Sequence, residues 1–354
     1  MAGFTGIEKV AERAGVSIST VSRVLNGSKP VSDLLRKKVE EAVAELDYHK
    51  DDMAGSMKRR KTKNIAVILP QLQMLYFPEI LRGIESSVEQ RGYKLLYFST
   101  HYDFSLEQEY IHMLKTSWVD GIVLDSCCAV DQMEEHRRLL ESETGRRAVP
   151  VVSLENNFGS EKIGCVTIDN HSLAREATAH LTGLGHRRIA MLTGRMDLQI
   201  CVENVNGYRD ALQEAGIAVD EKLIVTCDYT PQDGYRAVYK LKEQGVDYSA
   251  VFAANDAMAV GAIKALKELG LRIPQDVAVV GFDNTFVGTL IEPSLSSVDV
   301  PLHSMGYEAA EMLLNALEEG GEKLDTVILD GKLVVRNSSV ADKRVEWNLE
   351  NWYG

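Results

Sequence analysis

Several features that would place the chain in a special class are missing from its sequence. No apolar run approaches the roughly 20 residues that a helix needs to cross a bilayer, and no short apolar run follows a basic start as in a secretory signal. The five cysteines are an odd number, lack metal-ligand spacing and include the chain neighbours Cys127 and Cys128. These absences favour a cytoplasmic protein with reduced, mostly buried thiols, without a metal site and without a cofactor.

Motifs of the common nucleotide-binding and nucleophilic enzymes are also missing. The turns between expected strands and helices carry neither G-x-G-x-x-G nor G-x-x-x-x-G-K-[ST]. Serine, histidine and aspartate residues do not form a recognisable nucleophile motif. We therefore expect a protein that is not an enzyme.

Positive charge is scarce in the whole chain but not in its first part. The 354 residues carry a formal net charge of -13, from 39 Lys and Arg and 52 Asp and Glu. Residues 1–63 hold 13 basic and 9 acidic residues, a net +4, which leaves a net -17 for residues 64–354. The length predicts two or three domains, and the segregated charge indicates that the small first domain meets phosphates.

Residues 7–26 have the pattern of a helix-turn-helix. Small apolar residues on one face of a first helix let a second helix approach closely, and Gly15 permits the tight turn between them. Ser17 is placed to cap the second helix, and a third amphipathic helix with Ser32 as its cap completes a three-helix unit. The residues expected to face inward are Val10, Ala11, Ala14, Val21, Val24, Leu25, Leu35, Val39, Ala42, Val43 and Leu46.

The outer face of the second helix carries short polar groups and one cation. Ser19, Ser22, Arg23 and Asn26 recur at i, i+3, i+4 and i+7, which puts them on one side of that helix. Such side chains reach base edges in a major groove. An ordinary helical hairpin with a polar face is the alternative, but the full pattern with its third helix favours DNA binding.

A basic linker follows the three helices. Asp51 and Asp52 are placed to cap a short helix, although Gly55 within it costs about 1 kcal/mol relative to alanine. The run from Lys58 to Lys63 reads either as a solvated linker or, directly behind a helix-turn-helix, as a segment that lies along phosphates.

From residue 64 onward, short apolar runs alternate with amphipathic helices. This alternation predicts parallel, doubly wound sheets, because each buried strand is followed by a helix that returns the chain. One such helix is expected over residues 79–91, with Gly92 as its stop. The strands are expected at 65–69, 94–98, 121–124, 151–154, 189–192, 223–226, 250–253 and 277–282.

Polar pairs follow three of these expected strands. They are Glu155-Asn156, Asn255-Asp256 and Asp283-Asn284. Each pair alone reads as a helix cap or a turn. Because ligands of such sheets bind beyond the carboxyl ends of the strands, three pairs in one repeated location indicate a shared polar site.

The same residues resemble one family throughout, from Ile7 to about Ala341: the LacI/GalR family of bacterial transcription regulators. The resemblance rests on the helix-turn-helix pattern and on further signatures in the family's order. These are Leu46-Asp47-Tyr48, Val119-Asp120-Gly121-Ile122, Gly185-His186-Arg187-Arg188-Ile189, Asn255-Asp256-Ala257-Met258-Ala259 with Gly261, Pro274-Gln275-Asp276-Val277 and Gly281-Phe282-Asp283-Asn284.

The resemblance implies a fold and an assembly. It implies an N-terminal all-α helix-turn-helix headgroup and an α/β core, similar to periplasmic binding proteins, of two doubly wound parallel-sheet lobes with an effector between them. It also implies a homodimer on a pseudo-palindromic double-stranded DNA operator. The expected parts are the headgroup at 1–49, a hinge helix and basic linker at 50–63, the core at 64–341 and a tail at 342–354. Within the core, one lobe is expected at 64–163 and 295–324, and the other at 164–292 and 325–341.

The resemblance places two sets of binding residues. On the DNA side these are Ser17, Ile18, Ser19, Thr20, Ser22, Arg23 and Asn26, with Ile18, Ser19 and Arg23 at base-reading positions, and Met57 as a minor-groove wedge in the hinge. In the effector cleft they are Tyr76, Phe77, Glu155, Asn204, Phe252, Asn255 and Asp283.

The sequence departs from the family pattern in the hinge and in the cleft. Lys50-Asp51 replaces the usual Pro-Asn of the hinge, which predicts a hinge helix that is costly to order. Asn204 stands where the family has a cleft Arg, so anionic effectors are disfavoured unless Arg195 substitutes. A neutral sugar is the first expectation and a purine corepressor the second.

Two other functions compete with a small-molecule-controlled repressor. A solute-binding module for transport would need a signal peptide and would leave residues 1–63 without a role. An enzyme would need a nucleophile or cofactor motif. The tail holds Trp347, Leu349 and Trp352 but no heptad repeat, so a dimer is expected rather than a coiled-coil tetramer.

Overall fold

The computed structural model describes residues 6–26, 30–48, 62–72, 75–116, 119–142, 149–320 and 323–343. The chain divides into two compact units, Met1–Thr62 and Lys63–Gly354. The linker from Asp51 to Lys61 and the C-terminal tail beyond Lys343 lie outside the described residues, and the predictions for the hinge helix and for Met57 fall there.

The first unit is the predicted bundle of three short helices. Gly15 ends the first helix in the left-handed conformation, with φ 65°, which turns the chain into the second helix. Ser32 occupies the N-cap position of the third helix, but its side chain makes no cap hydrogen bond, so the predicted side-chain cap is wrong. The helices are α1 (Ile7–Ala14), α2 (Ile18–Asn26) and α3 (Asp33–Glu45), and Val10, Ala11, Ala14, Val21, Val39 and Ala42 form the buried centre.

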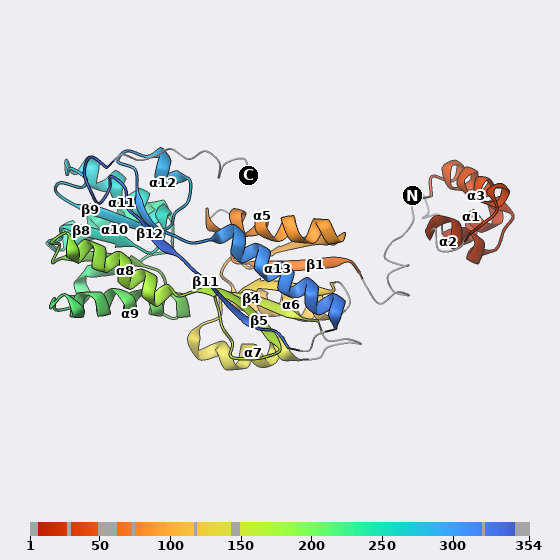
Figure 1. Ribbon diagram of the computed structural model, residues 1–354, viewed down its shortest axis with the longest axis horizontal. Helices are drawn as coiled ribbons and strands as arrows, with labels where there is room; N and C mark the ends of the chain where they lie inside the picture. The colour runs from red at the N-terminus through yellow and green to blue at the C-terminus, as the bar shows by residue number, and fades with distance from the viewer. Residues whose placement is uncertain are drawn as a thin grey trace. The chain divides into compact units, whose positions relative to one another are not determined.

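The second unit contains two sheets, each covered by helices on both faces (Figure 1). Strand β1 shows why its sequence is an unbroken apolar run: Ile65 and Val67 pack toward one layer of helices, whereas Ala66 and Ile68 pack toward the other. This confirms the expected doubly wound architecture.

The first sheet has the strand order β11-β5-β4-β3-β1-β2, all parallel. Its strands are β1 (Asn64–Leu69), β2 (Lys94–Ser99), β3 (Gly121–Asp125), β4 (Val151–Leu154), β5 (Ile163–Ile168) and β11 (Thr326–Leu329). Its helices are α5 (Tyr76–Val88), η1 (Glu89–Arg91), α6 (Phe104–Lys115), η2 (Val130–Gln132), α7 (Met133–Glu141) and α13 (Leu302–Glu319).

The second sheet has the order β12-β10-β9-β8-β6-β7, in which only the β10 to β12 pairing is antiparallel. Its strands are β6 (Ile189–Thr193), β7 (Ile224–Thr226), β8 (Ala250–Ala253), β9 (Ala278–Asp283), β10 (Ser296–Asp299) and β12 (Lys332–Val334). Its helices are α8 (Asn170–Gly183), α9 (Gln199–Glu214), η3 (Glu221–Leu223), α10 (Pro231–Glu243), α11 (Asp256–Glu268) and α12 (Val287–Leu290).

The chain crosses between the two lobes three times, later than the sequence predicted. Strand β5 pairs with β4, and β11 pairs with β5, so both belong to the first lobe. Strand β10 pairs with β9 in the second lobe. The crossings therefore follow β5, β10 and β11, whereas the sequence placed them after 163, before 295 and after 324. The sequence predicted no strand at 163–168, 296–299 or 326–329, so it did not place the crossings at the ends of these strands.

The prediction of reduced, mostly buried cysteines is confirmed. All five cysteines are free and buried. None of the helices in the described ranges combines the length and the hydropathy that a bilayer span requires.

Candidate DNA-binding helix and effector cleft

Helix α2 presents a polar surface on the outside of the first unit. Ser17 and Ser19 are exposed, with their hydroxyl oxygens 2.9 Å apart. Ser17 Oγ also accepts the backbone N–H of Thr20 at 3.2 Å, as expected of the N-cap. Arg23 is exposed and makes no ion pair with any residue that the structure describes. A hydroxyl cluster and a guanidinium are thus available on one helix.

Ile18 is an exposed apolar side chain beside these polar groups. It is 48% exposed, although it opens a helix whose other apolar residues face inward. Thr20 and Ser22 are half-buried, and Ser22 has further interactions within the protein. Asn26 ends α2, but its side chain lies outside the described residues. The predicted base-reading positions Ile18, Ser19 and Arg23 all lie on the accessible surface.

Acidic residues end strands of both lobes: the polar pairs predicted Glu155 and Asp283 at such places, whereas Asp125 was not predicted. Asp125 ends β3, Glu155 follows β4, and Asp283 ends β9. Glu155 has φ 62° and Asp283 has φ 98°, in the left-handed region that non-glycine residues rarely adopt. Such strain costs about 1–3 kcal/mol per residue and concentrates at functional sites.

The carboxylate of Glu155 already has three donors within the protein. The Tyr76 hydroxyl donates to Oε1 at 2.9 Å, while Asn170 Nδ2 and Thr167 Oγ1 donate to Oε2 at 2.8 and 3.3 Å. Burial raises the pKa of Glu155, but these hydrogen bonds oppose the increase. In this arrangement Glu155 orients Tyr76 and Asn170 at the cleft.

The other two carboxylates have no such partners. Neither Asp125 nor Asp283 makes a hydrogen bond or an ion pair with the described residues, and Asp283 is 9% exposed. Burial raises the pKa of Asp283 well above its usual range, with the charges of Asp256 and Glu155 adding to the effect. Burial likewise raises the pKa of Asp125, with contributions from Glu155 and Glu107.

The Tyr76 hydroxyl connects these acids. Burial raises the pKa of Tyr76 first, and then the charges of Glu155, Asp125 and Asp283 raise it further. A single phenol therefore senses carboxylates from both lobes. Of these three carboxylates, the one in hydrogen-bond contact with the phenol is that of Glu155.

Asp256 holds the segment that carries Asp283. Its carboxylate accepts the backbone N–H of Thr285 at 2.6 Å, the Thr285 hydroxyl at 2.9 Å and the Ser297 hydroxyl at 2.6 Å. Burial raises the pKa of Asp256 to about 6, against these bonds. The sequence marked Asp256 only as part of a polar pair, and the structure shows it as the anchor of the strained turn.

Asn204 and Asn170 lie on neighbouring helices that approach very closely. A Cβ at Gly207 would lie 2.1 Å from the backbone oxygen of His171, so only glycine allows α9 this close to the start of α8. Asn170 and Asn204 are each 2% exposed, and the Oδ1 atom of each has no hydrogen-bond partner in the structure.

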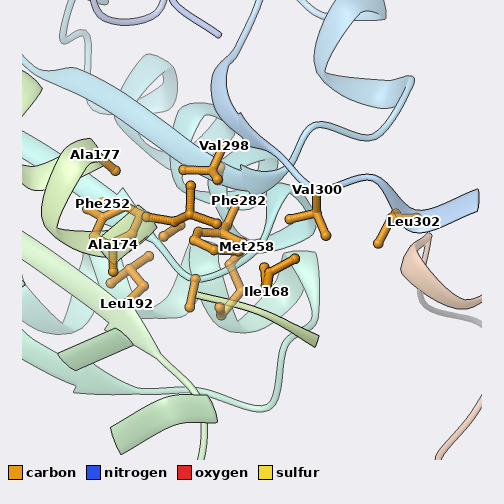
Figure 2. Close-up of a cluster of buried hydrophobic side chains, with 14 of the residues drawn as sticks. Ile168, Ala174, Ala177, Leu192, Phe252, Met258, Phe282, Val298, Val300 and Leu302 are labelled. Atoms are coloured by element: carbon orange, nitrogen blue, oxygen red, sulfur yellow. The ribbon is translucent and has the colours of Figure 1, made fainter. Parts of the chain in front are cut away.

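Three predicted cleft residues are engaged elsewhere. Asn255 caps α11: its Oδ1 accepts the Met258 N–H, and its Nδ2 donates to the Tyr229 oxygen. Phe252 is fully buried among Leu192, Met258 and other apolar side chains (Figure 2), so its prediction as a lining residue is wrong. Phe77 is only 3% exposed and packs its ring against Tyr76, with centroids 5.1 Å apart. Helices cover both faces of a strand such as β8, so an aromatic there points into the core.

A cavity of about 740 Å³ adjoins the segment that follows Asp125, and its lining residues were not predicted. It lies between the lobes, since the Val130 N–H donates to the Asp197 oxygen across its edge at 2.8 Å. Arg195 lines it but is bound by Asp197, with Nε 3.1 Å from Oδ1. The lining residues are Tyr102, Asp103, Phe104, Ser105, Gln108, Cys127, Ala129, Asp131, Gln132, Arg195 and Asp197.

Two tyrosines were also missed. Tyr102 follows β2 and Tyr229 follows β7, and both have positive φ, 61° and 62°. The Tyr229 hydroxyl lies 2.8 Å from Cys201 Sγ, and burial raises the pKa of both phenols. Searching every strand end, rather than only those followed by acids and amides, would have found them.

A buried carboxylate fixes the wall of the cavity. Glu107 on α6 is fully buried and accepts the Ser126 hydroxyl at 2.6 Å, the Cys127 N–H at 2.9 Å and the Cys127 thiol at 3.2 Å. His136 Nε2 on α7 lies 2.9 Å from the same carboxylate. The segment that follows Asp125, the last residue of β3, is therefore held by Glu107.

Known proteins match both units of the chain. Residues 62–336 match the family described as periplasmic binding proteins and sugar binding domain of LacI family, and residues 6–51 match bacterial regulatory proteins, lacI family. The transcriptional regulator AscG of Escherichia coli strain K12 is 33% identical over 344 residues, 96% of this chain and 100% of its own length.

Two solved structures show the same likeness in three dimensions. The transcriptional regulator CelR in complex with cellobiose is 32% identical, with TM-score 0.71, over 94% of this chain and 99% of its own. The Lac repressor dimer bound to operator and the anti-inducer ONPF is 25% identical, with TM-score 0.79, over 96% of this chain and 100% of its own. This chain therefore belongs to the LacI family of DNA-binding transcriptional regulators, in which a helix-turn-helix headgroup is joined to an effector-binding core.

Proposed function

We propose that the chain is a repressor that binds its operator as a homodimer, under the control of a hydroxyl-rich effector without negative charge. Neutral sugars are the first candidates and purines the second. The effector lies between the two lobes and changes the affinity for DNA, as an inducer or as a corepressor. We expect the protein in the cytoplasm and expect it to leave the effector chemically unchanged.

The observation that carries the effector class is the charge of the cleft. Asp125 and Glu155 stand at strand ends of one lobe and Asp283 at a strand end of the other, and none of them has an ion pair within the described residues. Among the described residues that line the adjoining cavity, the cation is Arg195, and Asp197 binds it in two places. An anionic ligand would meet repulsion from the acids and would have to displace Asp197. The cellobiose complex of the related regulator supports a sugar.

The choice of a sugar over a purine rests on the aromatic side chains. Phe77 and Phe252, which could have stacked on a flat base, are buried in the core. The tyrosines that remain at the cleft, Tyr76, Tyr102 and Tyr229, carry hydroxyl groups that suit a polar ring.

On the DNA side, the proposal rests on the exposed face of α2. Arg23 can donate two hydrogen bonds to a guanine, and Ile18 can cover a thymine methyl. Met57 is proposed as the minor-groove wedge and Asn26 as a further contact, by their place in the family pattern.

Operator selection followed by fluorescence anisotropy tests the proposal. The full chain is expected to select a pseudo-palindromic site, and at least one neutral sugar is expected to change its affinity by about 5- to 150-fold, in either direction. Sugar phosphates should have weaker effects than their parent sugars. A chain that selects no palindromic site, or that responds best to an anion, contradicts the proposal.

A further inference from the structure

Carboxyl groups and unpaired hydrogen-bond acceptors dominate the effector cleft. Asp125 from one lobe and Asp283 from the other are carboxylates without a hydrogen-bond or ion-pair partner among the described residues, and Asp283 is 91% buried by its 9% exposure. Burying a carboxylate without a partner costs several kcal/mol. A ligand that supplies donors at this point recovers that cost.

The unpartnered amide atoms of the cleft point to the same kind of ligand. Asn170 donates its Nδ2 to Glu155 at 2.8 Å, so the side chain cannot turn over, and its free atom is the acceptor Oδ1. Asn204 Oδ1 is a second buried acceptor without a partner. Both residues are almost completely buried, with 2% of their surface exposed. The ligand must therefore bring several donors.

The protein offers no cation to balance the acids. No Lys or Arg in the described part of the chain forms an ion pair with Asp125, Glu155 or Asp283. Glu155 has neutral donors, namely the hydroxyls of Tyr76 and Thr167 and the amide of Asn170. Ligand hydroxyls satisfy lone pairs, but they leave the charge unbalanced. An ammonium group supplies three donors and a positive charge at once.

We infer that the effector carries a protonated amine beside its hydroxyls, so that an amino sugar is the favoured ligand class and its neutral parent sugar the weaker one. This rests on the proposed function and narrows it. The ammonium group lies between Asp125 and Asp283, and the hydroxyls bind Asn170 and Asn204. The tyrosine rings at the cleft add a favourable surface for a cation.

Calorimetry on the full chain with matched sugars tests the inference. Each set comprises a hexose, its 2-amino derivative and the N-acetyl derivative, which keeps the substituent but loses the charge, in the gluco, galacto and manno series. At pH 7 one amino sugar is expected to bind about tenfold or more tighter than both of its partners in the set. Titration in two buffers of different ionisation enthalpy should also show proton release on binding of the amine only.

Asparagine variants locate the effect. Asp283→Asn and Asp125→Asn should each reduce the preference for the amine to about threefold or less, while operator binding without ligand confirms that they fold. Asp131→Asn, the same change at an exposed residue of the cavity wall, should keep the full preference.

The outcomes separate the inference from the proposed function. If a neutral sugar binds as tightly as its amine and changes operator affinity, the inference is wrong and the proposed function stands. If the amine preference survives in Asp283→Asn and Asp125→Asn, the inference is also wrong. If no sugar or amino sugar binds or alters operator affinity, both are wrong.

Discussion

The surface of α2 and the cleft between the lobes differ in how they present polar groups to a ligand. On α2 the side chains of Ile18, Ser19 and Arg23 are exposed and contribute little to the core beneath them. In the cleft, Glu155 and Asp283 are largely buried, and a second layer of residues holds the segments around them. Function and folding are therefore separable at the DNA end and coupled at the effector end.

The largest effect on stability is expected from a substitution of Glu107, which tests whether the residues behind the cleft are coupled to folding. Glu107→Ala should destabilise the core by about 3–5 kcal/mol, because it leaves the Ser126 hydroxyl and the Cys127 N–H buried without their acceptor. Chemical unfolding of the full chain, followed by circular dichroism, measures it. Glu109→Ala on the exposed side of the same helix is the control and should change little. Equal effects of the two variants would show that the second layer is not coupled to folding.

At the DNA end, Arg23→Ala should leave stability unchanged and weaken operator binding by about 1–3 kcal/mol, or roughly 5- to 150-fold. Anisotropy with the selected operator and a thermal melt measure the two quantities. Arg138→Ala replaces an exposed arginine on the surface of the second unit, and it should alter neither operator affinity nor thermal stability. A large loss of thermal stability in Arg23→Ala would contradict the separation of function from folding.

The ionisation of Asp256 should make the stability of the core depend on pH. Since burial raises its pKa from 3.8 to about 6, the folded state disfavours the ionised form. Its contribution to stability is therefore greatest below pH 4 and is lost as pH rises through 6, by about 1–3 kcal/mol. Asp256→Asn should remove this part of the pH dependence of the unfolding free energy between pH 4 and 7. If Asp256→Asn leaves the difference in unfolding free energy between pH 4 and pH 7 unchanged, Asp256 does not titrate in this range.

The smallest effect is expected at Arg195. Its pair with Asp197 is largely exposed, so Asp197→Asn should change stability by no more than about 1 kcal/mol. The freed guanidinium should nevertheless improve the binding of sugar phosphates several-fold relative to their parent sugars, as measured by calorimetry. Arg195→Ala should show no such gain. If Asp197→Asn leaves phosphate binding unchanged, Arg195 does not set the charge preference of the cleft.

Local patterns predicted most of the fold but not the partnering of its strands. The helix-turn-helix could be predicted because Gly15, Ser17 and the inward apolar residues act over a few positions. The strands β5 and β10 were not predicted, and their assignment to lobes depends on pairing between residues far apart in the chain, which no local spacing encodes.

The same limit applies to the cleft. Glu155, Asn204 and Asp283 were placed there by resemblance; the structure puts Glu155 directly after β4 of the first lobe, Asp283 at the end of β9 of the second lobe, and Asn204 on α9. Phe252 was misassigned because the choice between core and cleft depends on which face of β8 a side chain occupies. Glu107 and Asp256 were not predicted as anchors, because their partners Ser126 and Thr285 become neighbours only after folding.

The three crossings of the chain between the lobes limit how one lobe can move relative to the other. Links after β5, β10 and β11 join the lobes at separate points, so sliding or twisting one lobe against the other would strain at least one of them. Bending about the line of the links is the motion of lowest cost. Whatever the chemistry of the ligand, the core can then signal its binding through one variable, the angle between its two lobes.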